Sequence, residues 1–181
     1  MPGLVIRDAT ADDLEAIFSI YDGEVLHGTS TFDTTPRSPS QRLEWLEEHV
    51  GPRRPVIVAV RDGAVVGWAS LSAWSDRCAY ARAAEDSVYV ATGARGAGVG
   101  RALLQELIRR ARAAGLSVLL ARVVEGNPGS LRLHESVGFG TIGVMHRVGE
   151  KFGRILDVSL LELHLDSASP GRTAPTRRGR P

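Results

Sequence analysis

The stretch Arg95-Gly96-Ala97-Gly98-Val99-Gly100-Arg101 places a glycine-rich turn directly before a long amphipathic segment. From Val99 to Ala111 the apolar residues recur at helical spacing, and Gly115 ends the pattern. Glycines in such a turn let backbone N–H groups approach a ligand without obstruction by Cβ atoms. These N–H groups and the positive end of the helix dipole form a cradle for phosphate. A tight strand-to-helix turn would need the same glycines, so the turn alone leaves both interpretations open.

The segments before this turn predict strands joined by hairpins. Val56 to Val60 is apolar and β-branched, and Asp62-Gly63 is typical of a two-residue turn into a partner strand from Ala64 to Leu71. A loop from Ser72 to Ala84 then leads to a third strand, Ser87 to Val90. The other expected elements are a strand at Leu4 to Arg7, helices beginning after Thr10 and Ser38, a strand at Ser117 to Val123, a short helix opened by Asn127-Pro128, and strands at Thr141 to Val148 and Ile155 to Leu165.

The expected element order is therefore β-α-α-β-β-β-α-β-α-β-β, an α/β fold in which helices flank a mixed, twisted central sheet. In this interpretation residues 1–166 form one domain. Residues 167–181 shift in composition to Ser, Pro, Gly, Thr and Arg, which predicts a disordered basic tail.

Composition argues against several classes of protein. A chain of 181 residues with a formal net charge of +1 suits one globular domain, with no nucleic acid and no membrane as partner. Cys78 is the only cysteine, which excludes an internal disulfide and a cysteine-built zinc site. We expect no metal. The sequence has neither a basic-then-apolar leader nor an apolar run of about 20 residues, so we expect a cytoplasmic protein.

The glycine turn fits neither of two common phosphate-binding motifs. A Walker A loop ends in Gly-Lys followed by Ser or Thr, whereas Gly100 is followed by Arg101-Ala102. A dinucleotide-binding turn belongs to the first βαβ unit of a parallel sheet, whereas hairpin-linked strands come first here.

The motifs resemble those of the GNAT superfamily of acetyltransferases. Arg95-x-x-Gly98-x-Gly100 matches its pyrophosphate-binding motif, and Asn127-x-x-Ser130 with Leu133-His134 and Gly138-Phe139 matches its second coenzyme A segment. Other segments resemble the phosphinothricin and methionine sulfoximine N-acetyltransferases: Trp74-x-x-Arg77-x-x-Tyr80, Glu85-x-x-Val88-Tyr89-Val90, His134-Glu135, and Lys151-Phe152-Gly153 with Asp157. The resemblance implies a GNAT fold, acetyl-CoA as cosubstrate and a homodimer.

The resemblance also implies roles for cofactor-binding residues. Val88, Tyr89 and Val90 would present backbone groups to the pantetheine arm, with the Val90 N–H polarising the thioester carbonyl. Residues Gly96 to Arg101 would hold the pyrophosphate. Asn127, followed by Ser130, would hydrogen-bond the pantetheine arm, although Asn127 can also cap the next helix.

Two residues are candidates for acid–base catalysis. Amine acetylation requires removal of a proton from the substrate ammonium, and a carboxylate near the thioester can accept it. Glu85 lies just upstream of the Val88-Tyr89-Val90 strand, where the resembling family has its acidic residue; a solvated strand-end charge is the alternative. His134 would protonate the leaving thiolate or relay the ammonium proton, unless it is a structural hydrogen-bonder. No histidine lies near Cys78 in sequence, so we expect direct transfer in a ternary complex.

The expected acceptor is an amino acid analogue with at least one anionic group. Candidate partners for its charges are Arg77, Arg82 and Lys151, and candidate pocket walls are Phe32, Trp74 and Tyr80; solvated arginines and ordinary aromatic packing are the alternatives. The predicted function is N-acetylation of phosphinothricin, methionine sulfoximine or methionine sulfone at the α-amine. The alternatives are a GNAT enzyme acting on another small amine or a protein N-terminus, and a non-catalytic acetyl-CoA sensor.

Overall fold

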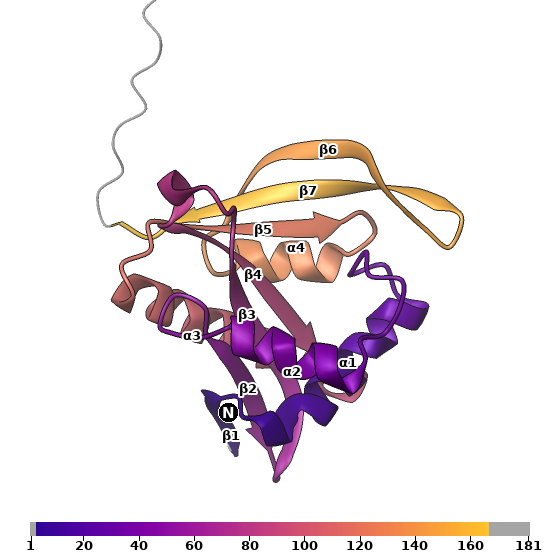
Figure 1. Ribbon diagram of the computed structural model, residues 1–181. Coiled ribbons are helices and arrows are strands. Elements are labelled where there is room, and N and C mark those ends of the chain that lie inside the picture. Colours follow the sequence, from indigo (N-terminus) through magenta and orange to yellow (C-terminus); the bar gives the residue numbers. More distant parts are fainter. Residues whose placement is uncertain (1–2, 167–181) are drawn as a thin grey trace, which may run out of the picture.

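The computed structural model describes residues 3–166, so the basic tail predicted at 167–181 lies outside the described residues. Seven strands form one sheet in the order β1-β2-β3-β4-β5-β7-β6 (Figure 1). The strands are β1 (Leu4–Asp8), β2 (Val56–Arg61), β3 (Ala64–Ala73), β4 (Ala83–Val90), β5 (Val118–Val124), β6 (Gly140–Lys151) and β7 (Arg154–His164). The α-helices are α1 (Leu14–His27), α2 (Pro39–Glu48), α3 (Val99–Ala113) and α4 (Pro128–Glu135). The expected fold class is confirmed.

Local signals start and end several elements where the sequence predicts. The Thr10 N–H donates to Asp13 Oδ2 at 2.8 Å, although a short 3-10 turn precedes α1. Ser38 accepts a hydrogen bond from the Gln41 N–H at the start of α2. Asp62 and Gly63 take positive φ angles of 51° and 81° in the β2–β3 hairpin, as the turn type demands.

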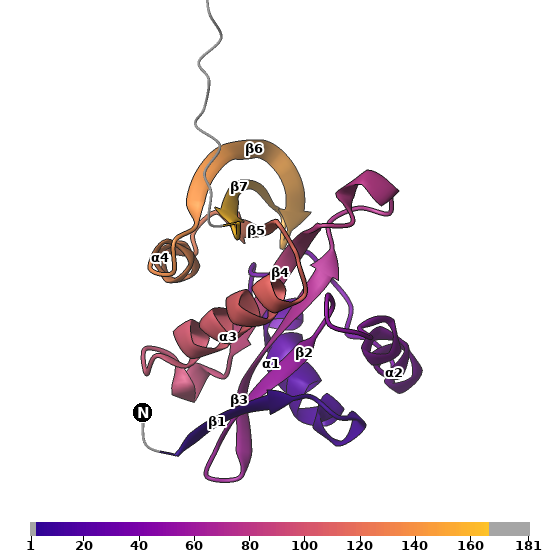
Figure 2. The ribbon, with the colours of Figure 1, turned by 90° about the vertical axis from the view of Figure 1, so that its left-hand side faces the viewer.

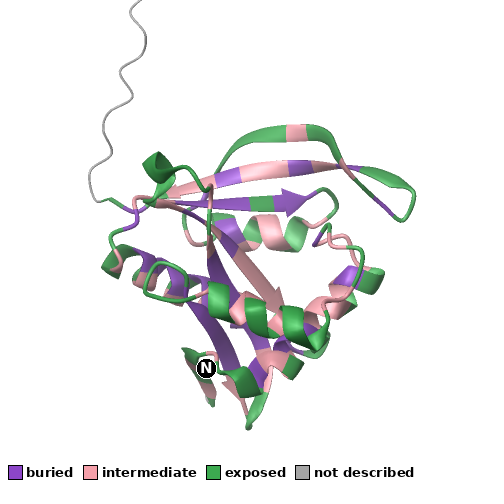
Figure 3. Cartoon of the chain, viewed as in Figure 1, coloured by how far each residue is buried: buried purple, intermediate pink, exposed green. Residues whose placement is uncertain are grey.

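Helices cover both faces of the sheet. Figure 2 shows α3 on one side of the strands and α2 on the other. On β2, Ile57 and Ala59 pack into the cluster that contains α3, whereas Val56 and Val58 pack with residues of α1. This alternation follows from the two-residue period of a strand. Buried residues are concentrated in the central strands and the inner face of α3, while β6 is largely exposed (Figure 3).

The structure corrects the predicted boundaries of two regions. β4 begins at Ala83, so Glu85 lies within the strand and not upstream of it. Glu85, Asp86 and Ser87 interrupt the apolar pattern expected of a strand. Pairing with β3 on one side and β5 on the other nevertheless holds this end of β4 in the sheet. The last hairpin is also longer than expected, and Phe152 and Gly153 form its turn with φ angles of 53° and 70°.

Candidate active site

A large cleft opens where two parallel strands separate. β4 and β5 pair only over Ala83–Glu85 and Val118–Leu120, and beyond these residues they diverge (Figure 1). The cleft has a volume of about 1110 Å³. Its walls come from both strands, the glycine turn, α4, the end of α1 and residues 28–33. This is enough space for a ligand larger than a typical drug-sized molecule.

The diverging part of β4 has backbone groups free to bind a ligand. The Ala91 N–H bonds to the Val66 carbonyl on β3 at 3.0 Å. Because hydrogen-bonding direction alternates along an antiparallel ladder, the N–H groups of Val88 and Val90 point away from β3, toward β5. At that level β5 no longer pairs with β4. An extended ligand arm in the cleft would therefore meet these groups as an added strand does.

The glycine turn has a geometry that suits phosphate. Gly96 and Gly98 have φ angles of 74° and 76°, in the left-handed region that favours glycine. Gly98 is the N-cap of α3 and provides no side-chain cap, so the first N–H groups of the helix are available to a ligand. A Cβ on Gly100 would lie 3.1 Å from Leu133 Cδ2, so this glycine also permits close packing of α3 against α4. Both interpretations of the turn thus have structural support.

Not every residue of the predicted pyrophosphate site faces the cleft. Gly96, Gly98, Val99, Gly100 and Arg101 line it, together with Arg95, whereas Ala97 does not. The Arg95 guanidinium donates to Glu24 Oε1 at 2.8 Å and to the Val90 carbonyl at 3.1 Å. Arg95 therefore braces the turn against α1 and β4.

Asn127 caps α4 and also reaches across the cleft wall. Its Oδ1 accepts from the Ser130 N–H at 3.0 Å, which satisfies a free donor of the first helical turn. Its Nδ2 donates to Ser30 Oγ at 3.3 Å. Asn127 and Ser130 both line the cleft, so the capping role does not exclude contact with a ligand.

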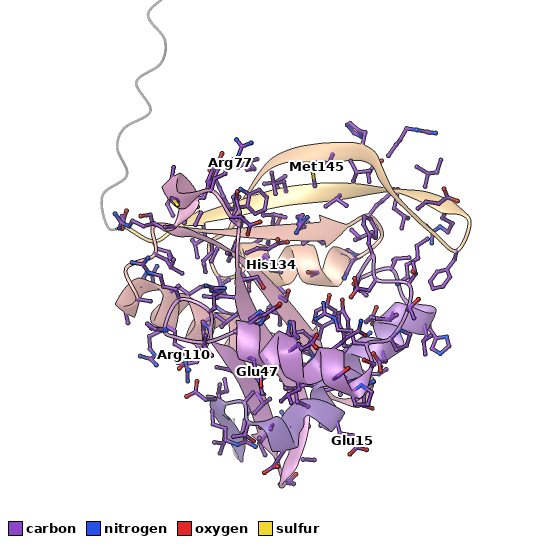
Figure 4. The ribbon with its side chains drawn as sticks, in the orientation of Figure 1. Glu15, Glu47, Arg77, Arg110, His134 and Met145 are labelled. Atoms are coloured by element: carbon purple, nitrogen blue, oxygen red, sulfur yellow. The ribbon has the colours of Figure 1, made fainter. Side chains whose placement is uncertain are left out.

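His134 belongs to a buried ion pair. Its Nε2 lies 3.0 Å from Asp86 Oδ2, and its Nδ1 lies 2.8 Å from the Ser130 carbonyl oxygen. An imidazolium, which donates from both ring nitrogens, would satisfy both of these acceptors. Burial opposes this charge, but the hydrogen bond and charge of Asp86 outweigh it and raise the pKa of His134 above its usual value. Figure 4 shows His134 between α4 and the sheet.

Glu85 and His134 approach the cleft from opposite faces of β4. Val88 and Val90 pack with the α3 cluster and Tyr89 with the α1 cluster, so by alternation Glu85 faces the α1 side and Asp86 the α3 side. The two predicted catalytic residues therefore both line the cleft, but they do not share one hydrogen-bond network among residues 3–166.

Glu85 is paired with a residue that the sequence analysis missed. Arg122 on β5 donates from Nε to Glu85 Oε1 and from Nη2 to Glu85 Oε2. The Arg122 guanidinium carbon lies 5.8 Å from the centre of the Trp74 ring. Arg122 is the one exposed residue in the otherwise buried or half-buried strand β5. A lone arginine in the apolar run Val118–Val124 was the available signal.

The predicted substrate residues are widely separated. Phe32 lines the cleft, and its ring lies over Gly149 on β6, where a Cβ would come within 2.2 Å of it. Arg77 and Tyr80 are exposed on the loop between β3 and β4, where Figure 4 labels Arg77. Arg82 donates to the Gly115 carbonyl at 3.0 Å and pairs with Asp166, away from the cleft. Trp74 does not line the cleft, but its ring lies beside the guanidinium of Arg122.

Lys151 is buried beneath the segment 28–33. Its Nζ donates to the carbonyl oxygens of Glu24 at 2.9 Å and Thr31 at 2.8 Å. Burial lowers the pKa of Lys151 below its usual value. In this position Lys151 holds the cleft wall in place, because it ties α1 and residue 31 to the end of β6.

Two tyrosines also form hydrogen bonds to residues of the segment 28–33. The Tyr21 hydroxyl donates to Asp33 Oδ2 at 2.8 Å, and burial raises the pKa of Tyr21 to about 12. The Tyr89 hydroxyl donates to the Ser30 carbonyl at 3.3 Å, and its ring stacks on Trp68. Tyr89 thus contributes its side chain to packing and its backbone to the cleft.

The described part of the chain contains neither a cluster of metal ligands nor a helix that could cross a membrane. Within residues 3–166 no group of three or more His, Cys, Asp or Glu side chains is placed to hold a metal ion. Among the described helices none is long and apolar enough to span a membrane.

Comparisons with known proteins agree with this geometry. Residues 14–139 match the model of the Acetyltransferase (GNAT) family. The chain is 41% identical over 171 residues to the L-methionine sulfoximine/L-methionine sulfone acetyltransferase of Pseudomonas aeruginosa, covering 94% of this chain and 98% of the relative.

Two solved structures have the same fold. One is a GNAT superfamily phosphinothricin acetyltransferase from Sinorhizobium meliloti in complex with acetyl-CoA, with a TM-score of 0.87, 36% identity and 96% of each chain covered. The other is a ribosomal-protein-alanine N-acetyltransferase from Brucella melitensis, with a TM-score of 0.86, 41% identity, and 89% of this chain and 99% of that chain covered. With its diverging strands, glycine turn and these matches, the chain belongs to the GNAT family of acetyltransferases.

Proposed function

We propose that this enzyme transfers an acetyl group from acetyl-CoA to the α-amine of a small amino acid analogue such as methionine sulfoximine, methionine sulfone or phosphinothricin. The observation that carries the proposal is the cleft between β4 and β5. It has phosphate-binding geometry at one end and the Glu85 carboxylate at the other. The names of the relatives in Pseudomonas aeruginosa and Sinorhizobium meliloti support the substrate class.

The residues of the cleft divide the work of binding and proton transfer. Bound acetyl-CoA would supply the thioester whose carbonyl carbon the amine attacks. The N–H groups of the turn from Gly96 to Arg101 hold its pyrophosphate. The N–H groups of Val88 and Val90 hold the pantetheine arm and polarise the thioester oxygen, and Asn127 bonds the arm from the opposite wall. Glu85 accepts the proton that the substrate ammonium must lose before attack.

For His134 we propose a positioning role in place of the catalytic role expected from the sequence. Both of its N–H groups are engaged, by Asp86 and by the Ser130 carbonyl. Donation of a proton to a leaving thiolate would break one of these bonds and leave Asp86 buried without its counter-ion. His134 therefore ties α4 to β4 and so keeps the two walls of the cleft at a constant distance.

Thiol release from acetyl-CoA tests the proposed function. The panel of acceptors holds methionine sulfoximine, methionine sulfone, phosphinothricin, ordinary amino acids and an N-terminal peptide. Glu85→Gln should lower kcat by about 10²–10⁴-fold while acetyl-CoA binding is retained. Glu44→Gln, an exposed position on α2, is the matched control and should retain full activity. A protein that binds acetyl-CoA and acetylates no acceptor, with Glu85→Gln indistinguishable from the parent, would be a sensor.

A protein N-terminus is the second candidate acceptor, because the Brucella melitensis relative is named for ribosomal-protein alanine. The same assay separates the two candidates. Peptides acetylated at least tenfold faster than free amino acids would transfer the proposal to protein substrates.

We also propose that the enzyme is a homodimer that pairs through β6. β6 lies at the edge of the sheet. Its apolar side chains Ile142, Val144 and Val148 are 48%, 46% and 51% exposed. Long apolar edge strands are generally covered by a partner. Light scattering coupled to gel filtration should give a dimer for the parent and for the control Val5→Lys on β1, and a monomer for Val144→Lys. A monomeric parent would refute the proposal.

A further inference from the structure

We propose that Arg122 binds the α-carboxylate of the acceptor and thereby places its α-amine beside Glu85. This inference rests on the proposed function and names the group that selects the substrate. It also replaces Arg77, Arg82 and Lys151, the basic residues expected from the sequence, none of which lines the cleft.

The guanidinium of Arg122 has donors to spare. Of its five N–H donors, one from Nε and one from Nη2 are engaged by Glu85. The remaining donors, on Nη1 and the outer side of Nη2, have no hydrogen-bond partner among residues 3–166. They form the end-on edge that receives a carboxylate through two parallel hydrogen bonds. Arg122 can therefore hold Glu85 and a substrate carboxylate at the same time.

Exposure indicates which side of the pair the ligand meets. The side chain of Arg122 is 53% exposed, whereas that of Glu85 is 17% exposed. Glu85 thus lies on the inner side, and the outer edge of the guanidinium is open. The centre of the Trp74 ring lies 5.8 Å from the guanidinium carbon of Arg122. Together with Glu85, this ring restricts rotation of the guanidinium group. The ion pair is held in one orientation before a substrate arrives.

The other cations of the cleft wall are not paired with Glu85. Arg95 is paired with Glu24, and His134 with Asp86. Arg101 belongs to the phosphate-binding turn at the start of α3. Arg122 is therefore the cleft-lining cation that is adjacent to the proposed base Glu85.

The covalent structure of an α-amino acid fixes the distance between its amine and its carboxylate. Its ammonium group is attached to the carbon that bears the carboxylate. A carboxylate on the outer edge of Arg122 consequently brings the α-amine next to the carboxylate that occupies the neighbouring edge, Glu85. An amino acid amide or ester, or a peptide N-terminus, lacks this charge and would bind without the second contact. The enzyme should therefore require a free α-carboxylate.

The experiment compares methionine sulfone with its carboxamide, which has the same amine and side chain. In the parent enzyme the acid should have a kcat/KM on the order of 30-fold or more above the amide, because a charged, partly exposed bidentate contact is lost. Arg122→Gln should abolish this preference by slowing the acid far more than the amide, although the loss of the partner of Glu85 should slow both acceptors to some extent. Arg122→Lys should retain part of the preference, since lysine keeps the positive charge but cannot form two parallel hydrogen bonds with a carboxylate. Arg112→Gln, an exposed position on α3, is the matched control.

The outcomes separate the inference from the proposed function. If the parent releases no thiol with either acceptor, the proposed function fails. If the parent acetylates acid and amide equally, or if Arg122→Gln slows both by the same factor, the function stands and the inference is wrong. Acetyl-CoA binding by each variant reports whether it folds. Should Arg122→Gln not fold, Arg122→Lys keeps the test available, because an unchanged acid-to-amide ratio in that variant would also contradict the inference.

Discussion

The buried pair of His134 and Asp86 leads to a prediction in which stability depends on pH. Asp86→Ala would leave the imidazolium buried without its counter-ion, at a cost of about 3–5 kcal/mol. For a domain of this size each kcal/mol lowers Tm by about 2–4 °C, so the variant should melt about 6–20 °C lower. In addition, the change removes contacts at the cleft wall, so the affinity for acetyl-CoA should fall.

The isosteric change Asp86→Asn should be milder and should alter the pH dependence. Oδ1 of Asp86 has no hydrogen-bond partner among residues 3–166, so the amide oxygen can take its place without losing a bond. The amide N–H₂ can then donate to Nε2 of a neutral imidazole, while Nδ1 still donates to the Ser130 carbonyl. The expected cost is about 1–2 kcal/mol. With the carboxylate gone, burial should lower the pKa of His134 below its usual value.

The sign of the pH effect follows from the raised pKa of His134 in the parent. The stability contributed by its protonated form is present in full below the unfolded-state pKa of about 6.5. It is lost as pH rises through the folded-state pKa. The difference in unfolding free energy between the parent and Asp86→Asn should therefore shrink as pH rises from about 6 to 9.

Urea unfolding of parent, Asp86→Ala and Asp86→Asn across this pH range measures the effect. Ring-nitrogen NMR of His134 reports its protonation state directly. A difference that stays constant with pH, or a cost of less than about 1 kcal/mol for Asp86→Ala, would show that the ring is not a buried imidazolium.

Three further changes test the glycine turn and the cleft wall. Gly98→Ala places a side chain at a φ angle of 76°, so it should cost about 1–2 kcal/mol in urea unfolding and raise the KM for acetyl-CoA; an unchanged KM would count against the phosphate cradle. Lys151→Met leaves the Glu24 and Thr31 carbonyls without their donor at about 1–3 kcal/mol each, and calorimetry should show a lower Tm. Gly149→Ala would place a Cβ within 2.2 Å of the Phe32 ring and displace it, so steady-state kinetics should show a raised KM for the acceptor with little change for acetyl-CoA.

The elements of this fold are largely determined by local sequence. Asp62-Gly63 can form its hairpin turn because both residues occupy positive φ angles, whatever the rest of the chain does. The periodicity from Val99 to Ala111 identifies the buried face of α3 in the same way. The glycine turn, followed by the motif that begins at Asn127, was enough to indicate the family, because both depend on residues close together in the chain.

The partners of the charged residues were decided only by tertiary structure. Glu85 and Arg122 meet because β4 and β5 pair at one end before they diverge, and no local pattern encodes that pairing. Asp86 shares a strand with Glu85, yet it faces the opposite side and finds its partner on α4. Lys151 is buried because the end of β6 passes beneath residues 28–33. A charge in a sequence indicates what it can bind, whereas its distance from each partner depends on packing between segments remote in the chain.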